Sequence, residues 1–398
     1  MADLSVDFLG KELPNPFLLA SAPPAATGPM IQRAFAAGWA GAVTKTLSLQ
    51  EIVNVRPRLG RLPRRGRLLA LENIELISDR PLATWLEEMT EIKRLYPDRM
   101  LVASLMAAVD REEWHRIVSL VEEAGADAVE LNLGCPHGMP ERGMGAIQGQ
   151  DPTIAADITF WVKEVATTPV IVKLTPNVTD ISTIARAVKA AGADAVAAIN
   201  TVACLVGIDL ETLRPLPAVH GQSAFGGLSG PAIKPIALRC VAEIARAVSL
   251  PVSGMGGIND WQDAAEFLLL GATTLQVCTA VMLRGYGLVG ELARGLSEYM
   301  DRQGFTSVAA MAGKVLPRIK RFEELDLDHR VVATIDAERC NGCQLCYTAC
   351  QDGAYAAIAM AEGRTAQVSQ ARCDGCGLCA IVCPVPDCIR LEPVATQR

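Results

Sequence analysis

The distribution of cysteine is the sequence feature that most restricts how this chain can fold. Nine of its 13 cysteines lie in the 49 residues from Cys340 to Cys388, and the other four are scattered over the first 339 residues. A disulfide framework suits a short exported chain, but we expect an unexported protein because Asp3 and Asp7 stand where an export signal carries basic residues. The crowded thiols therefore indicate metal binding in a separate C-terminal domain.

These cysteines form two runs with the same spacing, and Pro384 follows the second run. The pattern is typical of two-cluster ferredoxins, in which the fourth cysteine of each run binds the [4Fe–4S] cluster of the other run. Zinc is the alternative, but zinc modules pair two short knuckles and need no third or fourth cysteine in a run. The expected ligands are, for cluster one, Cys340, Cys343, Cys346 and Cys383, and for cluster two, Cys373, Cys376, Cys379 and Cys350. Cys388 is left over, and we expect a buried thiol there.

From about residue 15 to residue 300, short apolar runs alternate with longer helical patterns, which is typical of βα units on a parallel sheet. The phrase Ala-Gly-Ala-Asp-Ala-Val occurs at Ala124 and at Ala191, and its glycine suits the left-handed end of a helix. Eight nearly continuous apolar strands favour a closed (β/α)8 TIM barrel, with a doubly wound open sheet as the alternative. The expected strands are Phe17–Ala20, Ala42–Thr46, Leu101–Met106, Ala128–Leu133, Val170–Leu174, Ala195–Asn200, Pro251–Gly254 and Thr274–Cys278.

The barrel is expected to occupy residues 1–302, a charged linker residues 303–333, and the ferredoxin-like domain residues 334–398. A net charge of −7, without a basic stripe interleaved with aromatic residues, argues against nucleic acid as a partner. Apolar runs such as Ala195–Ile199 are far shorter than the roughly 18 residues of a membrane span. We therefore expect a cytoplasmic protein that binds neither nucleic acids nor membranes.

The expected strand exits carry polar residues, and the reactive groups of a TIM barrel come from these ends. Lys45 and Lys173 stand in apolar strands, where a lysine is costly to bury without an anionic or polar partner. A flavin ring, which is electron-rich when reduced, would be such a partner, although each lysine taken alone could simply cap the barrel mouth. Cys135 leaves the same rim and, with an ordinary pKa of about 8.5, could serve in acid–base chemistry or merely pack as a small apolar side chain.

Glycine-rich segments follow the last two expected strands, where barrels often bind phosphate through backbone N–H groups. Gly256 and Gly257 follow the seventh strand, and Thr279 follows the eighth. The loop Gly226–Gly230 could add further amides. No Gly-x-Gly-x-x-Gly fingerprint follows a strand in a βαβ unit, so we expect a phosphate site without a dinucleotide site of that kind.

Longer motifs join these signals, namely Asn73–Ile77, Glu130–Met139, Glu141–Gly145, Lys173–Asp180, Asn200–Val202 and the two cysteine runs. In these motifs nearly the whole chain resembles the dihydropyrimidine dehydrogenase family, in particular the catalytic subunit of its bacterial NAD-dependent members. The resemblance implies a dihydroorotate dehydrogenase-like barrel that binds FMN, followed by a domain with two [4Fe–4S] clusters. Where the family pattern has serine before its cysteine, this chain has Gly134.

The resemblance also implies roles for single residues. Cys135 would be the general acid, and the glycine-rich stretch 137–149 would be its mobile loop. Positions that match FMN contacts are Ser21, Ala22, Lys45, Thr46, Lys173, Gly230, Met255, Gly256, Gly257, Cys278 and Thr279. Positions that match pyrimidine contacts are Asn73, Glu75, Asn132, Asn200 and Thr201. The implied reaction reduces the C5–C6 double bond of uracil or thymine, with a hydride from flavin N5 and a proton from the thiol.

A nicotinamide cofactor gives two electrons together, whereas a [4Fe–4S] cluster accepts one at a time. We therefore expect a separate subunit that carries FAD and binds NAD(P)H, joined with this chain in an oligomer. One alternative is a dihydroorotate dehydrogenase-like enzyme. Glu75 argues against this alternative because it would repel the orotate carboxylate. The other is an electron-transfer adapter whose barrel only holds the flavin for a partner enzyme.

Overall fold

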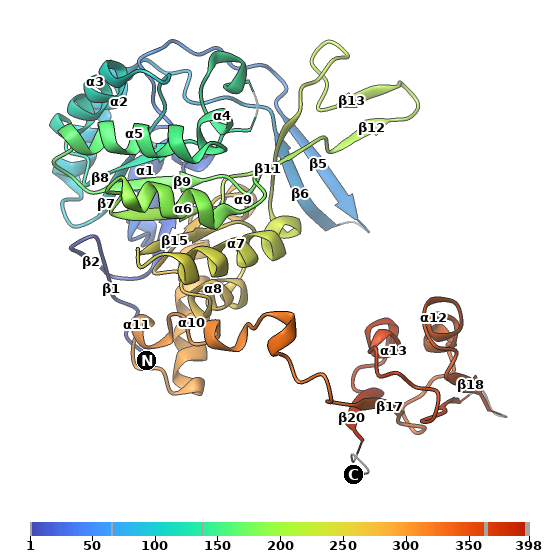
Figure 1. Ribbon diagram of the computed structural model, residues 1–398. Coiled ribbons are helices and arrows are strands. Elements are labelled where there is room, and N and C mark those ends of the chain that lie inside the picture. Colours follow the sequence, from blue (N-terminus) through green and yellow to red (C-terminus); the bar gives the residue numbers. More distant parts are fainter. Residues whose placement is uncertain (1, 65–66, 137, 362–364, 395–398) are drawn as a thin grey trace. The chain divides into compact units, whose positions relative to one another are not determined.

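A computed structural model describes residues 2–64, 67–136, 138–361 and 365–394 of the chain (Figure 1). The chain divides into two compact units, Met1–Arg318 and Ile319–Arg398. His137, expected at the start of a mobile loop, lies outside the described residues.

The first unit contains a closed barrel of eight parallel strands, in which each strand pairs with its neighbours along the chain and the last pairs with the first. All eight expected strands are present, with ends that differ by a few residues, so the prediction of a TIM barrel is confirmed and the open sheet is excluded. The barrel strands are β3 (Phe17–Leu19), β4 (Gly41–Val43), β7 (Met100–Leu105), β8 (Ala128–Asn132), β9 (Val170–Leu174), β10 (Ala195–Ala198), β15 (Val252–Met255) and β16 (Thr274–Val277).

Helices surround the barrel because their apolar faces pack against the outer side of the strands. They are α1 (Gly28–Ala37), α2 (Leu82–Leu95), α3 (Arg111–Glu123), α5 (Pro152–Val165), α6 (Ile181–Ala190), α7 (Lys234–Ala247), α8 (Trp261–Leu269) and α10 (Leu288–Gln303). Several begin at a side chain that accepts a backbone N–H of the first turn, as Asp110, Asp151 and Asp180 do. In the described part of the chain, no helix is long and apolar enough to cross a membrane.

The repeated Ala-Gly-Ala-Asp phrase joins a helix to the next barrel strand. Gly125 and Gly192 have φ of 92° and 98°, which confirms the left-handed position predicted for them. The aspartates that follow are also structural, since Asp127 Oδ2 accepts from the backbone N of Leu101 at 2.7 Å and Asp194 Oδ2 accepts from that of Val170 at 2.7 Å. Each phrase therefore ends a helix and ties the new strand to its neighbour.

A four-stranded antiparallel sheet, which we call the lid sheet, was not expected from the sequence. Its strands are, in order, β11 (Val202–Cys204), β14 (Gly226–Ser229), β6 (Arg67–Asn73) and β5 (Leu59–Arg64). Between β11 and β14 the chain forms a hairpin of β12 (Gly207–Asp209) and β13 (Arg214–Leu216), which extends away from the barrel beside β5 and β6 (Figure 1). The lid sheet joins two segments about 150 residues apart at the C-terminal end of the barrel.

The opposite end of the barrel is covered by the hairpin of β1 (Val6–Phe8) and β2 (Lys11–Leu13), whose Phe8 and Leu13 pack with inward-facing strand residues. After α10, the short helix α11 (Val308–Met311) adds Val308 and Met311 to the barrel core. Part of the segment expected as a linker thus packs with the barrel, and the first unit continues to Arg318.

The second unit repeats one arrangement, in which a cysteine run leads into a short helix. Its helices are α12 (Leu345–Gly353) and α13 (Leu378–Val382), and its strand pairs are β17 (Val331–Ile335) with β20 (Ile389–Pro393), and β18 (Ile358–Met360) with β19 (Ala366–Val368). The buried core consists largely of cysteine and alanine, together with Ile358 and Ile389. So little apolar side-chain volume indicates that bound metal must supply much of the stability.

Candidate functional site

A cavity of about 680 Å³ opens at the C-terminal end of the barrel, between the strand exits and the lid sheet. Every barrel residue that was expected to bind FMN or the pyrimidine, or to act as the general acid, lines this one cavity. They are Ser21, Ala22, Lys45, Thr46, Asn73, Glu75, Asn132, Cys135, Lys173, Asn200, Thr201, Gly230, Met255, Gly256, Gly257, Cys278 and Thr279. Because these side chains come from seven barrel strands and the lid sheet, the fold brings together groups up to about 260 residues apart.

Three of the polar residues form a chain of hydrogen bonds across the cavity floor. Asn200 Nδ2 donates to Asn132 Oδ1 at 2.9 Å, and Asn132 Nδ2 donates to Thr46 Oγ1 at 2.9 Å. Thr46 Oγ1 also lies 3.1 Å from Ser21 Oγ and 2.9 Å from Ser104 Oγ. Both asparagine side chains are thereby fixed in orientation, which prepares them to recognise a planar ligand with alternating donors and acceptors.

Gly134 is required by this arrangement. A Cβ added at position 134 would lie 2.7 Å from Asn200 Nδ2 and 2.9 Å from Asn200 Cβ. The departure from the serine of the family pattern therefore makes room for Asn200 to reach Asn132.

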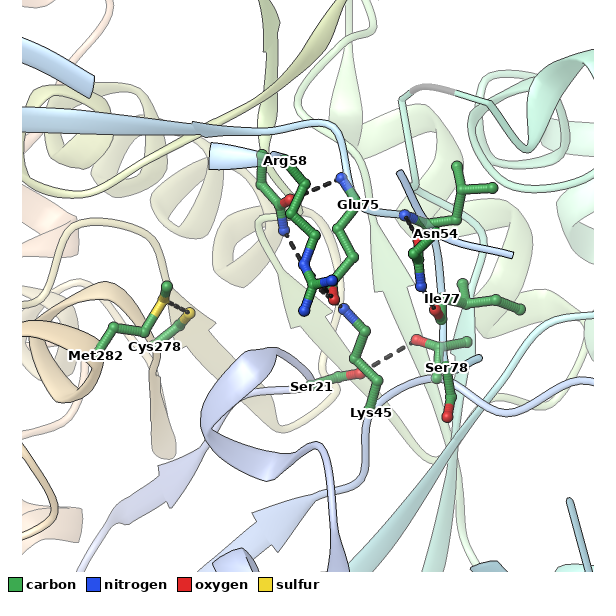
Figure 2. Close-up of polar contacts among 12 residues, drawn as sticks. Ser21, Lys45, Asn54, Arg58, Glu75, Ile77, Ser78, Cys278 and Met282 are labelled. Carbon is green, nitrogen blue, oxygen red and sulfur yellow. Dashed lines mark hydrogen bonds and ion pairs between the residues drawn. The ribbon is translucent and has the colours of Figure 1, made fainter. Parts of the chain in front are cut away.

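Glu75 is held by two cations (Figure 2). Lys45 Nζ lies 2.6 Å from Glu75 Oε2, and Arg58 Nε lies 3.1 Å from Glu75 Oε1. The carboxylate was expected to repel orotate, but each of its two oxygens is paired with a cation. Repulsion by Glu75 therefore does not argue against an anionic ligand.

The loop that carries Glu75 is anchored on both sides. The backbone N of Glu75 donates to Asn73 Oδ1 at 2.7 Å. Asn54 binds the residues after Glu75, accepting from the backbone N of Leu76 at 2.7 Å and donating to the carbonyl of Ile77 at 3.0 Å (Figure 2). The position of the carboxylate is thus set by the loop as well as by its ion pairs.

A second polar network lies inside the barrel, below the cavity. Glu130 is fully buried, with Oε2 accepting from Gln276 Nε2 at 2.8 Å and Oε1 lying 3.5 Å from Lys173 Nζ. Within the described residues, Glu130 Oε1 and Gln276 Oε1 have no hydrogen-bond partner. Lys173 and Gln276 both line the cavity, so they offer a cation and an acceptor to a bound ring.

The end of the cavity near β15 and β14 is shaped by glycines with positive φ. Gly230, Gly256 and Gly257 have φ of 94°, 122° and 87°. A Cβ at Gly257 would lie 2.8 Å from Lys234 Cβ and 3.0 Å from the Gly230 carbonyl O, so no side chain fits there. Bare backbone at this end suits a phosphate, as expected from the sequence.

These features together fit FMN. Leu69, Leu71 and Ile258 give the cavity apolar walls for a ring, the two lysines can face its electron-rich edge, and the glycines leave backbone free for its phosphate. Desolvation raises the pKa of the Cys278 thiol to about 11, although Lys173 and Lys45 act to lower it. Cys278 is therefore a neutral contact at physiological pH.

Cys135 follows β8 and is buried, with 8% of its surface exposed. Its carbonyl accepts from the backbone N of Ala146 at 2.9 Å, and Met139 and Met144 pack in the same apolar cluster. The segment expected as a mobile loop thus packs around the cysteine through these residues and includes the short helix α4 (Ala146–Gly149).

In the second unit, two small cavities divide the cysteines. One is lined by Cys340, Cys343, Cys346, Cys383 and Cys388, and the other by Cys350, Cys373, Cys376 and Cys379. Each cavity therefore receives three cysteines of one run and the fourth of the other, which fits two [4Fe–4S] clusters with exchanged ligands. No three His, Cys, Asp or Glu side chains of the described residues are placed to hold a single metal ion.

Cys388 is buried as expected, and its Sγ donates to the Asp336 carbonyl at 3.7 Å. Three barrel residues that contact the site were missed by the sequence reasoning: Arg58, Ser104 and Gln276. A polar residue inside an apolar strand, the signal used for Lys173, would have found Ser104 in β7 and Gln276 in β16. Arg58 lies in a polar segment and gives no such signal.

Comparison with known proteins agrees with this geometry. Residues 3–300 match the dihydroorotate dehydrogenase family, whose members bind FMN, and residues 333–391 match the 4Fe–4S dicluster domain, which holds two clusters. The NAD-dependent dihydropyrimidine dehydrogenase subunit PreA of Escherichia coli K12 is 42% identical over 394 residues, covering 98% of this chain and 95% of that one.

Two further relatives each match over 79% of this chain. The chloroplastic NADP-dependent dihydropyrimidine dehydrogenase of Arabidopsis thaliana is 44% identical over that share and over 77% of its own length. The catalytic subunit of dihydroorotate dehydrogenase B from Pyrococcus abyssi is 39% identical over the same share of this chain and over 99% of its own length. The chain therefore belongs to the FMN-binding dihydroorotate dehydrogenase family, within its dihydropyrimidine dehydrogenase group, and carries a C-terminal 4Fe–4S dicluster domain.

Proposed function

We propose that this chain reduces the C5–C6 double bond of uracil or thymine to the 5,6-dihydropyrimidine. The observation that carries the proposal is the single cavity that brings Cys135 together with the carboxamides of Asn73, Asn132 and Asn200, the carboxylate of Glu75 and two lysines. The relative that spans both units, at 42% identity, is a dihydropyrimidine dehydrogenase subunit, whereas the dihydroorotate dehydrogenase match covers 79% of this chain.

Recognition would take place between the lid sheet and the barrel. Asn73 and Glu75 come from the lid side, and Asn132, Asn200 and Thr201 come from the strand exits. A pyrimidine edge alternates C=O acceptors with N–H donors, so carboxamides can serve both and a carboxylate can accept from an N–H. The hydrogen bond from Asn200 to Asn132 leaves part of each carboxamide for the ligand.

The chemistry divides between cofactor and protein. The eleven positions named for FMN would hold it, and bound there it would supply a hydride to one carbon of the double bond. Cys135 gives its thiol proton to the neighbouring carbon, so that two hydrogen atoms are added and the thiolate is reprotonated from solvent before the next turnover. Leucines of the lid sheet line the cavity and would limit the access of water, and Lys173, which also lines it, would stabilise negative charge.

Electrons would reach the barrel through two [4Fe–4S] clusters bound by the two sets of four cysteines. We infer that a separate subunit with FAD takes hydride from NAD(P)H and passes single electrons to these clusters, in an oligomer of both subunits. The relative named as a subunit of an NAD-dependent enzyme supports this arrangement. A reducing compartment such as the cytoplasm suits a chain with this many unpaired thiols.

Anaerobic turnover of the FMN- and cluster-loaded chain tests the proposal. An artificial low-potential donor should drive conversion of uracil and thymine, but not orotate, to dihydropyrimidines, and NADH alone should not. Conversion of orotate alone would favour a dihydroorotate dehydrogenase, and reduction of the flavin without any conversion would favour the adapter. Rapid NADH-dependent conversion by the chain alone would refute the separate subunit.

A further inference from the structure

The two cations that contact Glu75 differ in their position in the fold and in their exposure to solvent. Lys45 leaves barrel strand β4, lines the cavity and has 9% of its side chain exposed. Arg58 directly precedes strand β5 of the lid sheet, and 36% of its side chain is exposed. Lys45 lines the cavity, whereas Arg58 is not among the residues that line it.

The single ammonium group of Lys45 has two partners, Glu75 and the expected flavin. It donates to Glu75 Oε2 at 2.6 Å, and it is also one of the two lysines that can face the electron-rich edge of the flavin. When Lys45 interacts with the flavin, less of its positive charge is available to balance the carboxylate of Glu75. The Arg58 contact with Glu75 Oε1 does not depend on the cavity's contents, and a guanidinium keeps its charge at every physiological pH.

Glu75 must point a carboxyl oxygen into the cavity to accept an N–H from a pyrimidine. Its side chain is 8% exposed, so protein groups rather than solvent set its orientation. Lys45 and Arg58 each contact one of its two carboxyl oxygens.

We propose that Arg58 is a positioning residue for substrate recognition, which holds the carboxylate of Glu75 aimed into the cavity while Lys45 serves the flavin. This inference rests on the proposed pyrimidine site and adds a residue that touches neither ligand nor cofactor. The lid sheet would then contribute to substrate specificity. Asn73 belongs to its strand β6, and Arg58 directly precedes its strand β5, which pairs with β6.

The test is a titration of the oxidised FMN- and cluster-loaded chain with uracil, in the absence of any electron donor, followed by the change in flavin absorption. Arg58→Gln should raise the dissociation constant of uracil by about 10- to 100-fold, the range expected for a hydrogen bond to a charged group. Arg58→Lys should restore part of the affinity. Arg61→Gln is the matched control, since Arg61 is exposed on strand β5, which Arg58 directly precedes, and the change in net charge is equal. It should bind uracil as the wild type does.

A double-mutant cycle shows whether Arg58 acts through Glu75. In a Glu75→Gln background, Arg58→Gln should weaken uracil binding by less than about 3-fold, because its target is gone. Equal affinity of Arg58→Gln and wild type, or full additivity of the two changes, would overturn the inference alone. Failure of the wild type to bind uracil would overturn the proposed function, and this inference with it.

Discussion

The two units of this chain differ in where their functional groups lie relative to the buried core. In the barrel, Trp39, Trp85 and Trp114 are fully buried among aliphatic side chains, and the polar site lies above that core at the strand exits. In the second unit, six of the eight cysteines expected to bind the clusters belong to the core itself, and Cys343 and Cys376 are exposed. A site built on a core can be altered without unfolding its scaffold, whereas a site that is the core cannot.

The difference also separates the sources of stability. Burial of large apolar side chains stabilises the barrel whether or not a cofactor is bound. The second unit buries mainly cysteine and alanine, so its folding free energy must come largely from metal–sulfur bonds. Loss of a ligand should therefore affect activity in one unit and folding in the other.

The largest expected effect comes from iron removal, which should unfold the second unit and leave the barrel intact. The loaded chain should contain about eight iron and eight sulfide atoms. Chelation of the iron should make residues after Arg318 sensitive to protease while the barrel resists cleavage, as gel analysis with mass spectrometry would show. Cys350→Ala should lower the iron content, and Cys240→Ala, a buried barrel cysteine, should not. Zinc in place of iron, or a protease-resistant iron-free unit, would contradict this picture.

Loss of the thiol of Cys135 should abolish chemistry without affecting either fold. Cys135→Ala should slow pyrimidine reduction by about 10²- to 10⁴-fold, because only the proton donor is lost. FMN content and flavin reduction by an artificial donor should stay as in the wild type, as absorption spectra would measure. Cys240→Ala again serves as the control, with normal turnover expected. Unchanged turnover of Cys135→Ala would remove this residue from the proposed mechanism.

Breaking the buried pair of Glu130 and Lys173 should destabilise the barrel alone. Glu130→Leu leaves Lys173 buried without its counter-charge, which typically costs about 3–5 kcal/mol of unfolding free energy. All five tryptophans lie before residue 262, so denaturant unfolding followed by tryptophan fluorescence reports on the barrel. Cluster absorption at low denaturant should not change. The double variant Glu130→Leu with Lys173→Met should recover much of the loss, and equal stability of the single variant and the wild type would show that the pair is unimportant.

The smallest effect concerns a helix cap on the outside of the barrel. Asp151 Oδ1 accepts from the backbone N of Thr153 at 2.8 Å and of Ile154 at 3.2 Å, so Asp151→Ala should cost about 1 kcal/mol. Asp157→Ala removes the same charge from another turn of the same helix and should change stability much less. Equal losses from the two variants, measured by the same fluorescence titration, would point to charge and not to capping.

Regular features of the molecule could be predicted because they repeat along the chain. The apolar run before Lys173 and the helix-ending glycines at 125 and 192 predict strands and helix ends locally, and all eight barrel strands are predicted by such signals. The spacing of the cysteines likewise predicts which thiols share a cavity. The residues of the barrel site were expected from strand exits and from the family resemblance, and they line one cavity.

The lid sheet was decided only by the tertiary structure. Its strand β6 pairs with β14, so that Asn73 lies opposite Gly227, a partner more than 150 residues away. The four strands are short and mix glycine with charged and apolar residues, so they lack the periodic pattern that marks a strand. Hydrogen bonds between distant segments, and not local preference, hold them in place.

The contacts between the site residues were also decided only by the tertiary structure. The sequence determined that Glu75 and Lys45 would be available at the mouth of a barrel, and that Gly134 departs from the family pattern. Only the tertiary structure decided that Lys45 and Arg58 converge on Glu75 and that Asn200 fills the space beside Gly134. The physical reason is that ion pairs and close contacts act through space, so they are selected when the lid sheet meets the strand exits, and no spacing along the chain encodes them.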